Sequence, residues 1–177
     1  MSTLTLILGG ARSGKSSYGE QLATSLSDDV LFVATAQAWD EDMAARIERH
    51  KADRPSHWQT VEAPKSIATC LEGKSADVIL IDCITLLVSN LLMVDEEMDG
   101  DRLESAVATE LSALIAKIET FKCHWIIISN EVGLGIVPNN RMTRLYRDAL
   151  GRANQRLAQK ADKVILMVAG IPVPITP

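Results

Sequence analysis

The 177-residue chain carries 18 Lys and Arg against 23 Asp and Glu, which gives a net charge of −5, and 47% of its residues are hydrophobic. This balance is ordinary for one globular domain with a buried core, and it argues against a protein that binds nucleic acid non-specifically. There is no apolar run long enough to span a bilayer and no signal segment at the N-terminus, so we expect a cytoplasmic protein without a membrane span. Cys70, Cys83 and Cys123 are widely separated. They form no zinc pattern or disulfide framework, and we expect them to be buried or half-buried.

The first predicted strand, near residues 3–8, leads into a glycine-rich loop. The run Gly9-Gly10-Ala11-Arg12-Ser13-Gly14-Lys15-Ser16 fits the pattern G-x-x-x-x-G-K-[ST], and a predicted helix follows it. In this pattern backbone N–H groups turn towards phosphate oxygens, Lys15 brings positive charge to the β- and γ-phosphates, and the Ser16 hydroxyl can ligate Mg²⁺. The alternative is a plain glycine-rich turn between a strand and a helix. The complete pattern in this position favours a site for a nucleoside triphosphate.

Strands and helices alternate along the rest of the chain. We expect strands at residues 30–35, 58–62, 78–82, 125–129 and 164–168, and helices at residues 16–26, 40–51, 64–71, 84–93, 102–121 and 140–160. This order predicts a single α/β domain over residues 1–177, with a mostly parallel sheet covered by helices on both faces. The proline-rich segment at about residues 170–177 lacks the N–H groups that a central strand needs. We expect it at the sheet edge or as an extended tail, in a position to lie against a neighbouring subunit.

Polar residues at the carboxyl ends of the strands are the first candidates for chemistry, because ligands bind at that edge of a parallel sheet. Besides the glycine-rich loop, this rule selects Thr35, Asp82, Asn130 and Glu131. Asp82 ends an apolar strand and is the expected second contact to Mg²⁺, direct or through water. It could also cap the helix that follows. Glu131 is a weaker candidate for a substrate or metal contact.

His50 shares one helix face with Met43 and Ile47, because their spacing is i, i+4, i+7. The histidine therefore points towards the protein body or a cleft, and Lys51 and Arg54 place positive charge beside it. One interpretation is a partly buried histidine with a single hydrogen bond. The other is a nucleophile or base within reach of bound phosphates. The spacing alone favours the first.

Basic residues also follow the last predicted helix, at Arg141, Arg144, Arg147, Arg152 and Arg156. Four of these five fall within an arc of roughly 120° on the helix. The row could line an anionic site, but a solvated helix face is the better interpretation. His57 and His124 are assigned no role.

Four segments together resemble one known family. They are Gly9–Ser16, Met43–Ile47 with His50–Lys51, Arg54–Pro55 with His57–Trp58, and Ser129–Pro138. In this order they resemble the bifunctional adenosylcobinamide kinase / adenosylcobinamide-phosphate guanylyltransferase family of cobalamin synthesis, and the matches extend from residue 4 to about residue 170. The glycine-rich loop is shared with many families, whereas the His50 segment and the loop from Asn130 to Pro138 are far more specific.

The resemblance implies two reactions, with adenosylcobinamide, its phosphate, GTP and ATP as substrates. Members phosphorylate a hydroxyl of adenosylcobinamide with ATP or GTP, then transfer GMP from GTP to that phosphate, giving adenosyl-GDP-cobinamide and pyrophosphate. The resemblance makes His50 the residue that carries GMP. Lys15 as a catalytic residue and Mg²⁺ held by Ser16 and Asp82 are expected from the glycine-rich pattern and the strand end described above. Some relatives carry glutamate at the position of Asp82, so the acid here is one methylene shorter. A P-loop fold similar to RecA and assembly as a homotrimer are also implied.

The nucleotide contacts implied by the resemblance are Gly9, Gly10, Ala11, Arg12, Ser13, Gly14, Lys15, Ser16, Ala34, Thr35, Ala36, Lys51, Ala52, Asp53, Arg54, Glu62 and Asp82. Two other classes of protein stay open at this point. A simple small-molecule kinase would need the glycine-rich loop and Asp82 but would never retain the α-phosphate of GTP. A nucleotide-dependent switch would turn over slowly, and adenosylcobinamide would not stimulate it.

Overall fold

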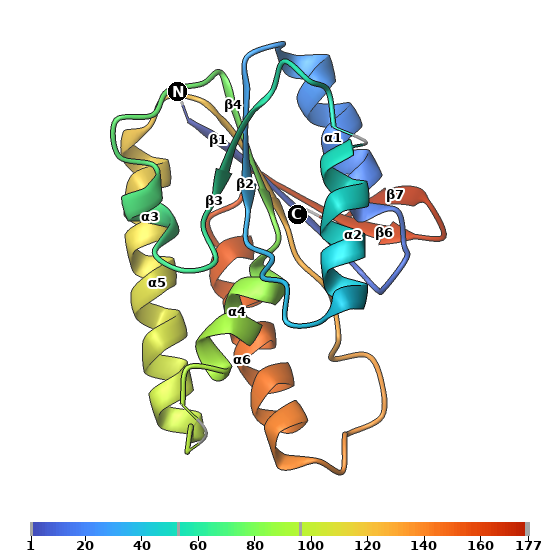
Figure 1. Ribbon diagram of the computed structural model, residues 1–177, viewed down its shortest axis with the longest axis vertical. Coiled ribbons are helices and arrows are strands. Elements are labelled where there is room, and N and C mark those ends of the chain that lie inside the picture. The colour runs from blue at the N-terminus through green and yellow to red at the C-terminus, as the bar shows by residue number, and fades with distance from the viewer. Residues whose placement is uncertain (1, 53, 96, 176–177) are drawn as a thin grey trace.

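The computed structural model describes residues 2–52, 54–95 and 97–175, which form a central sheet with helices on both faces (Figure 1). The strands are β1 (Thr3–Gly9), β2 (Val30–Ala34), β3 (Gln59–Glu62), β4 (Val78–Asp82), β5 (His124–Ile128), β6 (Lys163–Val168) and β7 (Ile171–Pro174). The helices are α1 (Lys15–Leu26), α2 (Glu41–Ala52), α3 (Ile67–Cys70), α4 (Ile84–Leu92), α5 (Gly100–Thr120) and α6 (Arg141–Ala158). The described part of the chain therefore has the predicted α/β architecture.

The sheet has the strand order β3-β2-β4-β5-β1-β6-β7. Neighbouring strands pair in parallel from β3 to β6, and β7 is antiparallel to β6. Pro172 and Pro174 lie in β7 at the edge of the sheet, where a missing N–H group interrupts no ladder on the outer side. Of the two positions predicted for this segment, its described residues therefore occupy the sheet edge.

Two hydrophobic clusters cover the two faces of the sheet. Side chains alternate between faces along a strand, so Leu6 packs in one cluster and its neighbour Ile7 in the other. The larger cluster joins the sheet to α3, α4, α5 and α6, and the smaller one joins it to α1. Because the sheet is buried on both faces, its central strands are continuous apolar runs in the sequence. No helix within the described residues combines the length and apolar character needed to cross a membrane.

The predicted helix at residues 64–71 is wrong in its extent, because α3 covers only Ile67–Cys70. The backbone N–H groups of Ser66 and Ile67 donate to the Glu110 carboxylate at 3.0 and 2.8 Å. These bonds hold the start of α3 against α5, and residue 66 lies in the left-handed region with φ of 54°. The start of this helix therefore depends on a contact between segments that are far apart in the sequence.

The three cysteines are buried or half-buried, as predicted. Burial raises the pKa of the Cys123 thiol to about 11, and the nearby Asp77 carboxylate adds to the effect. Burial also raises the pKa of Cys83 to about 12, with a further contribution from the Asp82 carboxylate. Thiols with such values stay protonated and unreactive near neutral pH.

We predict that Gly9→Ala lowers both stability and nucleotide affinity. A Cβ atom at residue 9 would lie 2.6 Å from Ser13 Oγ and 2.8 Å from the Met167 carbonyl oxygen, and this carbonyl belongs to the neighbouring strand β6. The loop or the strand would have to move, at a cost of about 1–3 kcal/mol. Urea unfolding and GTP titration measure the two effects.

Gly151→Ala is the matched control, because a Cβ at this helical position meets no atom within 4 Å. Alanine there should be neutral or stabilising by about 0.5–1 kcal/mol. Equal stability of Gly9→Ala and the wild type would contradict the steric argument.

Candidate active site

The glycine-rich loop connects the end of β1 to the start of α1. Gly14 precedes the helix with φ of 93°, and the N–H of Gly170 donates to the Ser13 carbonyl at 3.0 Å. Glycine at the N-cap leaves the first amide groups of α1 facing outwards, and the helix dipole makes this end attractive to anions. Lys15 Nζ donates to the Gly10 carbonyl at 2.8 Å, so its positive charge lies over the loop. This geometry suits the phosphates of a nucleotide.

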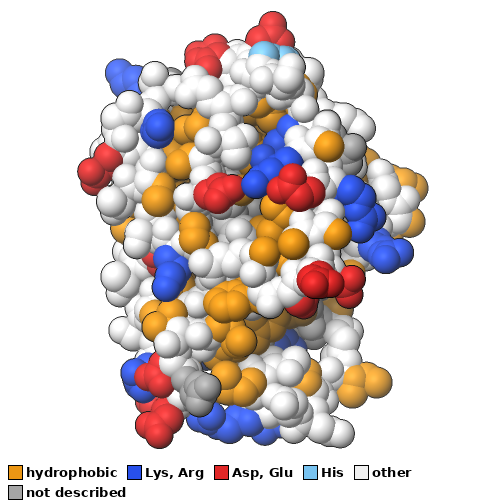
Figure 2. All heavy atoms as spheres, viewed as in Figure 1, with side chains coloured by type: hydrophobic (Ala, Val, Ile, Leu, Met, Phe, Trp, Pro, Cys, Tyr) orange, Lys and Arg blue, Asp and Glu red, His pale blue; other side chains and the backbone are white. Residues whose placement is uncertain are grey.

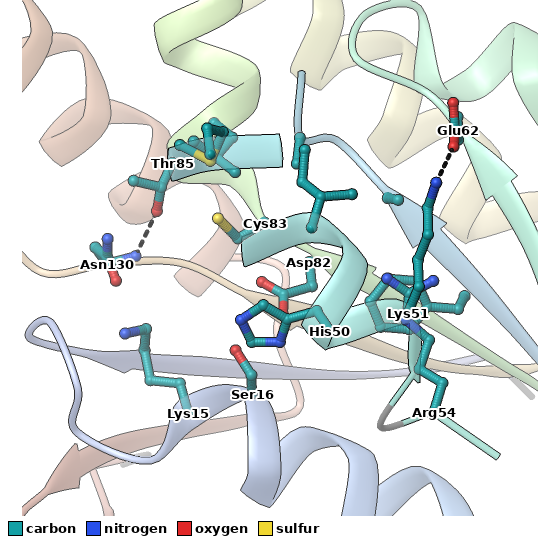
Figure 3. A pocket seen from close by; sticks show the side chains of 16 residues that line it. Lys15, Ser16, His50, Lys51, Arg54, Glu62, Asp82, Cys83, Thr85 and Asn130 are labelled. Atoms are coloured by element: carbon teal, nitrogen blue, oxygen red, sulfur yellow. Dashed lines mark hydrogen bonds and ion pairs between the residues drawn. The ribbon is translucent and has the colours of Figure 1, made fainter. Parts of the chain in front are cut away.

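A pocket opens beside Lys15 and Ser16 at the carboxyl edge of the sheet (Figure 3). It is lined by Lys15, Ser16, Phe32, Ala34, Ala36, Met43, Ile47, His50, Lys51, Arg54, Glu62, Asp82, Cys83, Thr85, Leu86 and Asn130. The residues come from α1, β2, α2, β3, β4, α4 and the segments that follow β2, α2, β4 and β5. The fold thus brings together side chains that are separated by more than a hundred positions in the sequence.

Ser16 and Asp82 present oxygen atoms to the same part of this pocket (Figure 3). A hydroxyl and a carboxylate are hard oxygen ligands of the kind that Mg²⁺ prefers. Mg²⁺ typically takes one or two protein oxygens and completes its shell with water and substrate phosphates. The side chains present therefore fit a magnesium ion held together with a nucleotide.

In Figure 3 the His50 ring is drawn between Ser16 and Asp82, and all three side chains line the same pocket. Met43 and Ile47 line the pocket with His50, which confirms the helix face predicted from their spacing. All three side chains are half-buried, and α2 therefore forms one wall of the pocket. The structure therefore places this imidazole beside the expected phosphate site.

Lys51 lies beside His50 and forms ion pairs with Glu62 at 3.1 Å and Glu48 at 3.5 Å. The hydrogen bond to Glu62 and the charge of that carboxylate raise the pKa of Lys51. Exposed pairs of this kind contribute only about 0–1 kcal/mol. A phosphate could therefore replace a carboxylate as the partner of Lys51 at little cost.

Arg54 follows α2 and stacks on an aromatic ring in the pocket wall. Its Cζ atom lies 3.7 Å from the centroid of Phe32, and Phe32 in turn stacks on Trp58 with centroids 6.5 Å apart. Burial lowers the pKa of Arg54, while the carboxylates of Glu20, Asp82 and Glu62 act in the opposite direction. The ring holds the guanidinium in place without neutralising it, so its charge remains available to an anion.

Thr35, directly after β2, contributes to the site through its hydrogen bonds to the backbone of Cys83, directly after the neighbouring strand β4. Its side chain is completely buried, its hydroxyl donates to the Cys83 carbonyl at 2.7 Å, and it accepts from the Cys83 N–H at 2.8 Å. Asn90 donates to the Thr35 carbonyl at 2.8 Å from inside α4. These bonds fix the chain directly after Asp82, so Thr35 orients the carboxylate from behind the pocket wall.

A second polar network holds the segment after β5. The Asn130 N–H donates to Thr85 Oγ1 at 2.7 Å, and the Asn154 amide donates to the Asn130 carbonyl at 2.9 Å. Buried Ser129 donates to Asn154 Oδ1 at 2.6 Å. Thr85 and Asn130 are thereby fixed on the side of the pocket where Lys15 lies (Figure 3).

Ten of the residues predicted from the sequence line this pocket, namely Lys15, Ser16, Ala34, Ala36, His50, Lys51, Arg54, Glu62, Asp82 and Asn130. Among the described residues, Gly9–Gly14, Thr35 and Ala52 are not part of the lining. The glycine-rich loop continues directly into Lys15, whereas Ala52 lies exposed at the end of α2. Asp53, also predicted as a nucleotide contact, lies outside the described residues.

The remaining candidates point elsewhere. Glu131 turns its carboxylate onto its own loop, where it accepts the Gly133 N–H. Four of the five α6 arginines bond to neighbouring loops or to α5, as when Arg156 donates to Ser112 at 2.9 Å and Arg152 pairs with Glu104 at 3.1 Å. Arg147 pairs with Asp148 of its own helix at 3.4 Å. Among the residues that the structure describes, none of these side chains lines the pocket. The arginine row therefore ties α6 to its surroundings.

Sequence reasoning missed the apolar and structural part of the site. Phe32, Cys83, Thr85 and Leu86 line the pocket, but they lie within or beside strongly apolar runs. Such runs are typical of a buried core, and nothing in their pattern distinguishes a pocket wall. Their position after a strand end was the signal available for Cys83 and Thr85.

A parallel sheet with this strand–loop–helix unit and these side chains at its carboxyl edge defines a nucleotide-binding protein of the P-loop class. A family model described as cobinamide kinase / cobinamide phosphate guanyltransferase matches residues 5–175, and the chain belongs to this family.

Curated relatives match the chain over nearly its whole length. The bifunctional adenosylcobalamin biosynthesis protein CobU of Salmonella typhimurium strain LT2 is 44% identical over 180 residues, which cover 97% of this chain and 99% of that protein. CobU of Escherichia coli K12 is 41% identical with the same coverage. The protein CobP of Pseudomonas aeruginosa PAO1, which carries the same description, is 42% identical over 174 residues, with 96% and 95% covered.

We predict that Thr35→Val destabilises the protein by about 1–3 kcal/mol, because the buried Cys83 N–H loses its partner. Valine keeps the shape of threonine, so packing changes little. Urea unfolding measures the loss, and Thr35→Ser, which keeps the hydroxyl, should lose less. A valine variant as stable as the wild type would show that the hydroxyl does not hold this segment.

Proposed function

We propose that this chain catalyses two successive reactions of cobalamin biosynthesis. It phosphorylates adenosylcobinamide with ATP or GTP, then transfers GMP from GTP to adenosylcobinamide phosphate, giving adenosyl-GDP-cobinamide and pyrophosphate. The observation that carries the proposal is that His50 lines the same pocket as Lys15 and Ser16 of the phosphate loop. The family description, which names both activities, supports it.

In the kinase step, the glycine-rich loop holds the triphosphate by its β- and γ-phosphates. A hydroxyl oxygen of adenosylcobinamide attacks the γ-phosphorus, and the bond to the β–γ bridging oxygen breaks. Lys15 and the amide groups at the start of α1 offset the charge that gathers on the transferred group and on the leaving diphosphate. This step needs no covalent intermediate on the protein.

In the guanylyl transfer, an imidazole nitrogen of His50 attacks the α-phosphorus of GTP. A phosphorus–nitrogen bond forms, the α–β bridging bond breaks, and pyrophosphate leaves. A phosphate oxygen of adenosylcobinamide phosphate then attacks the same phosphorus and releases the histidine. Neutral imidazole suits this role because it is nucleophilic near pH 7.

Lys51 and Arg54 are the proposed partners of the guanylyl phosphate. Both line the pocket next to His50, on the side away from Lys15 (Figure 3). With Lys15 facing the β- and γ-phosphates, the α-phosphate would be met by positive charge from the other side. Glu62, which holds Lys51 at 3.1 Å, is a further nucleotide contact in this proposal.

Mg²⁺ is the proposed cofactor, with Ser16 and Asp82 as its protein ligands. When bound, it supplies positive charge to the phosphate oxygens and to the pyrophosphate leaving group. Thr35 keeps the Asp82 segment in place through its two bonds to Cys83.

We also propose that the chain is a cytoplasmic homotrimer, an expectation that comes from the family. Sedimentation velocity tests the oligomeric state.

We predict that GTP labelled at the α-phosphate leaves a covalent, acid-labile label on the denatured wild-type protein but not on His50→Ala. The variant should lose guanylyl transfer by at least about 1,000-fold, because the nucleophile is removed. Its phosphorylation of adenosylcobinamide should persist, since that step does not use the histidine covalently.

His57→Ala is the matched control, because His57 is exposed and lies outside the described pocket wall. It should retain the label in full. Equal labelling of His50→Ala and the wild type would refute the carrier role. Nucleotide consumption that adenosylcobinamide does not stimulate would refute the whole proposal in favour of a nucleotide switch.

A further inference from the structure

The loop between β5 and α6 exposes large apolar side chains at its tip. We call residues 131–137 the apolar loop. Leu134 is 86% exposed, Ile136 is 96% exposed and Val137 is 58% exposed. Single exposed apolar residues are ordinary, but a cluster of three within four positions marks a surface that contacts something else.

Both ends of the apolar loop are anchored. At its start, the Glu131 N–H donates to the Gly9 carbonyl at 3.0 Å, and the preceding Asn130 N–H donates to Thr85. At its end, Arg144 Nη1 donates to the carbonyls of Pro138 at 3.0 Å and Asn139 at 2.6 Å. The fold therefore holds both ends of the apolar loop in a defined place.

That place is next to the phosphate loop. Asn130 lines the pocket on the same side as Lys15 (Figure 3), and the bond from Glu131 to Gly9 ties the apolar loop to the glycine-rich loop itself. Figure 2 shows apolar side chains gathered over the lower half of this face, where α4 and the β5–α6 connection lie. The other side of the pocket mouth carries the charged residues Glu48, Lys51 and Glu62 instead.

The size of the pocket limits what can enter it. In the proposed function the nucleotide occupies this pocket of about 150 Å³, so a corrin macrocycle with its four linked rings must lie outside it. The hydroxyl that accepts the γ-phosphate sits at the end of a flexible arm of that macrocycle. When the arm reaches the γ-phosphate near Lys15, the ring must lie outside the mouth on the Lys15 side.

We propose that the apolar loop is the docking surface for the corrin ring, with Leu134, Ile136 and Val137 packing against the methyl groups that the ring carries between its amide side chains. The inference rests on the proposed function and adds the surface that selects a corrinoid over smaller alcohols. Docking there leaves the nucleotide site untouched, because nucleotide and ring occupy different sides of the phosphate loop.

The test is the double variant Leu134→Ser/Ile136→Ser, assayed by equilibrium dialysis with adenosylcobinamide and detection of corrin absorbance. Loss of two apolar contacts should weaken binding by about 10- to 100-fold. The α-phosphate label on His50 forms from GTP alone, so its rate and GTP dependence should stay within about twofold of the wild type. The KM for adenosylcobinamide in the kinase reaction should rise more than kcat falls.

Met93→Ser/Val94→Ser is the matched control, because both residues are apolar and exposed, at 59% and 58%, directly after α4, and they do not line the pocket. It should bind the corrinoid like the wild type.

Unchanged corrinoid affinity in the loop variant would overturn the inference. So would a lower sedimentation mass, which would assign the apolar loop to a contact between subunits, or a lost His50 label, which would assign it to the nucleotide site. A wild-type protein that neither labels nor binds the corrinoid would instead refute the proposed function itself.

Discussion

The parallel register of four neighbouring strands fixes the geometry on which the whole site depends. Ile7 in β1 pairs with Ile128 in β5, Ile128 pairs with Asp82 in β4, and Asp82 pairs with Ala34 in β2. These residues form one level across the sheet, directly before the glycine-rich loop, the Cys83 segment and Thr35. Ladder hydrogen bonds and burial on both faces make this level rigid. Slipping one strand by a residue would turn its apolar side chains to the wrong faces and separate Asp82 from Ser16.

The rigid edge contrasts with the helix that carries the nucleophile. No side chain described in α2 is fully buried, and half-buried Met43, Ile47 and His50 line the pocket. The basic residues beside His50 are held by exposed ion pairs and by the Phe32 ring. The site therefore combines a fixed phosphate loop with a helix, α2, that is held more weakly and that carries His50 and the basic residues beside it. This division suits two reactions that break different bonds of one triphosphate.

Much of this arrangement could be predicted without the structure. The β-strands and most helices follow from apolar runs and periodicity, and the glycine-rich loop, Asp82 and the His50 face follow from position and spacing. The start of α3 could not be predicted, because Glu110 of α5 supplies its N-terminal hydrogen bonds. The role of Thr35 was equally hidden. Its place at a strand end suggested a ligand contact, whereas its hydroxyl forms hydrogen bonds with the N–H and carbonyl groups of Cys83.

By itself, the sequence determined where phosphates bind and which helix face carries His50, because both are local patterns set by spacing along the chain, whereas the carrier role of His50 came from the resemblance to the family. Only the tertiary structure decided which side chains meet. The stacking of Arg54 on Phe32, the bond between Asn130 and Thr85, and the anchoring of Glu131 to Gly9 each join elements distant in sequence. Such contacts depend on strand order and register, and no local pattern encodes these. The place of the apolar loop beside the phosphate loop is decided in the same way, since β5 pairs directly with β1.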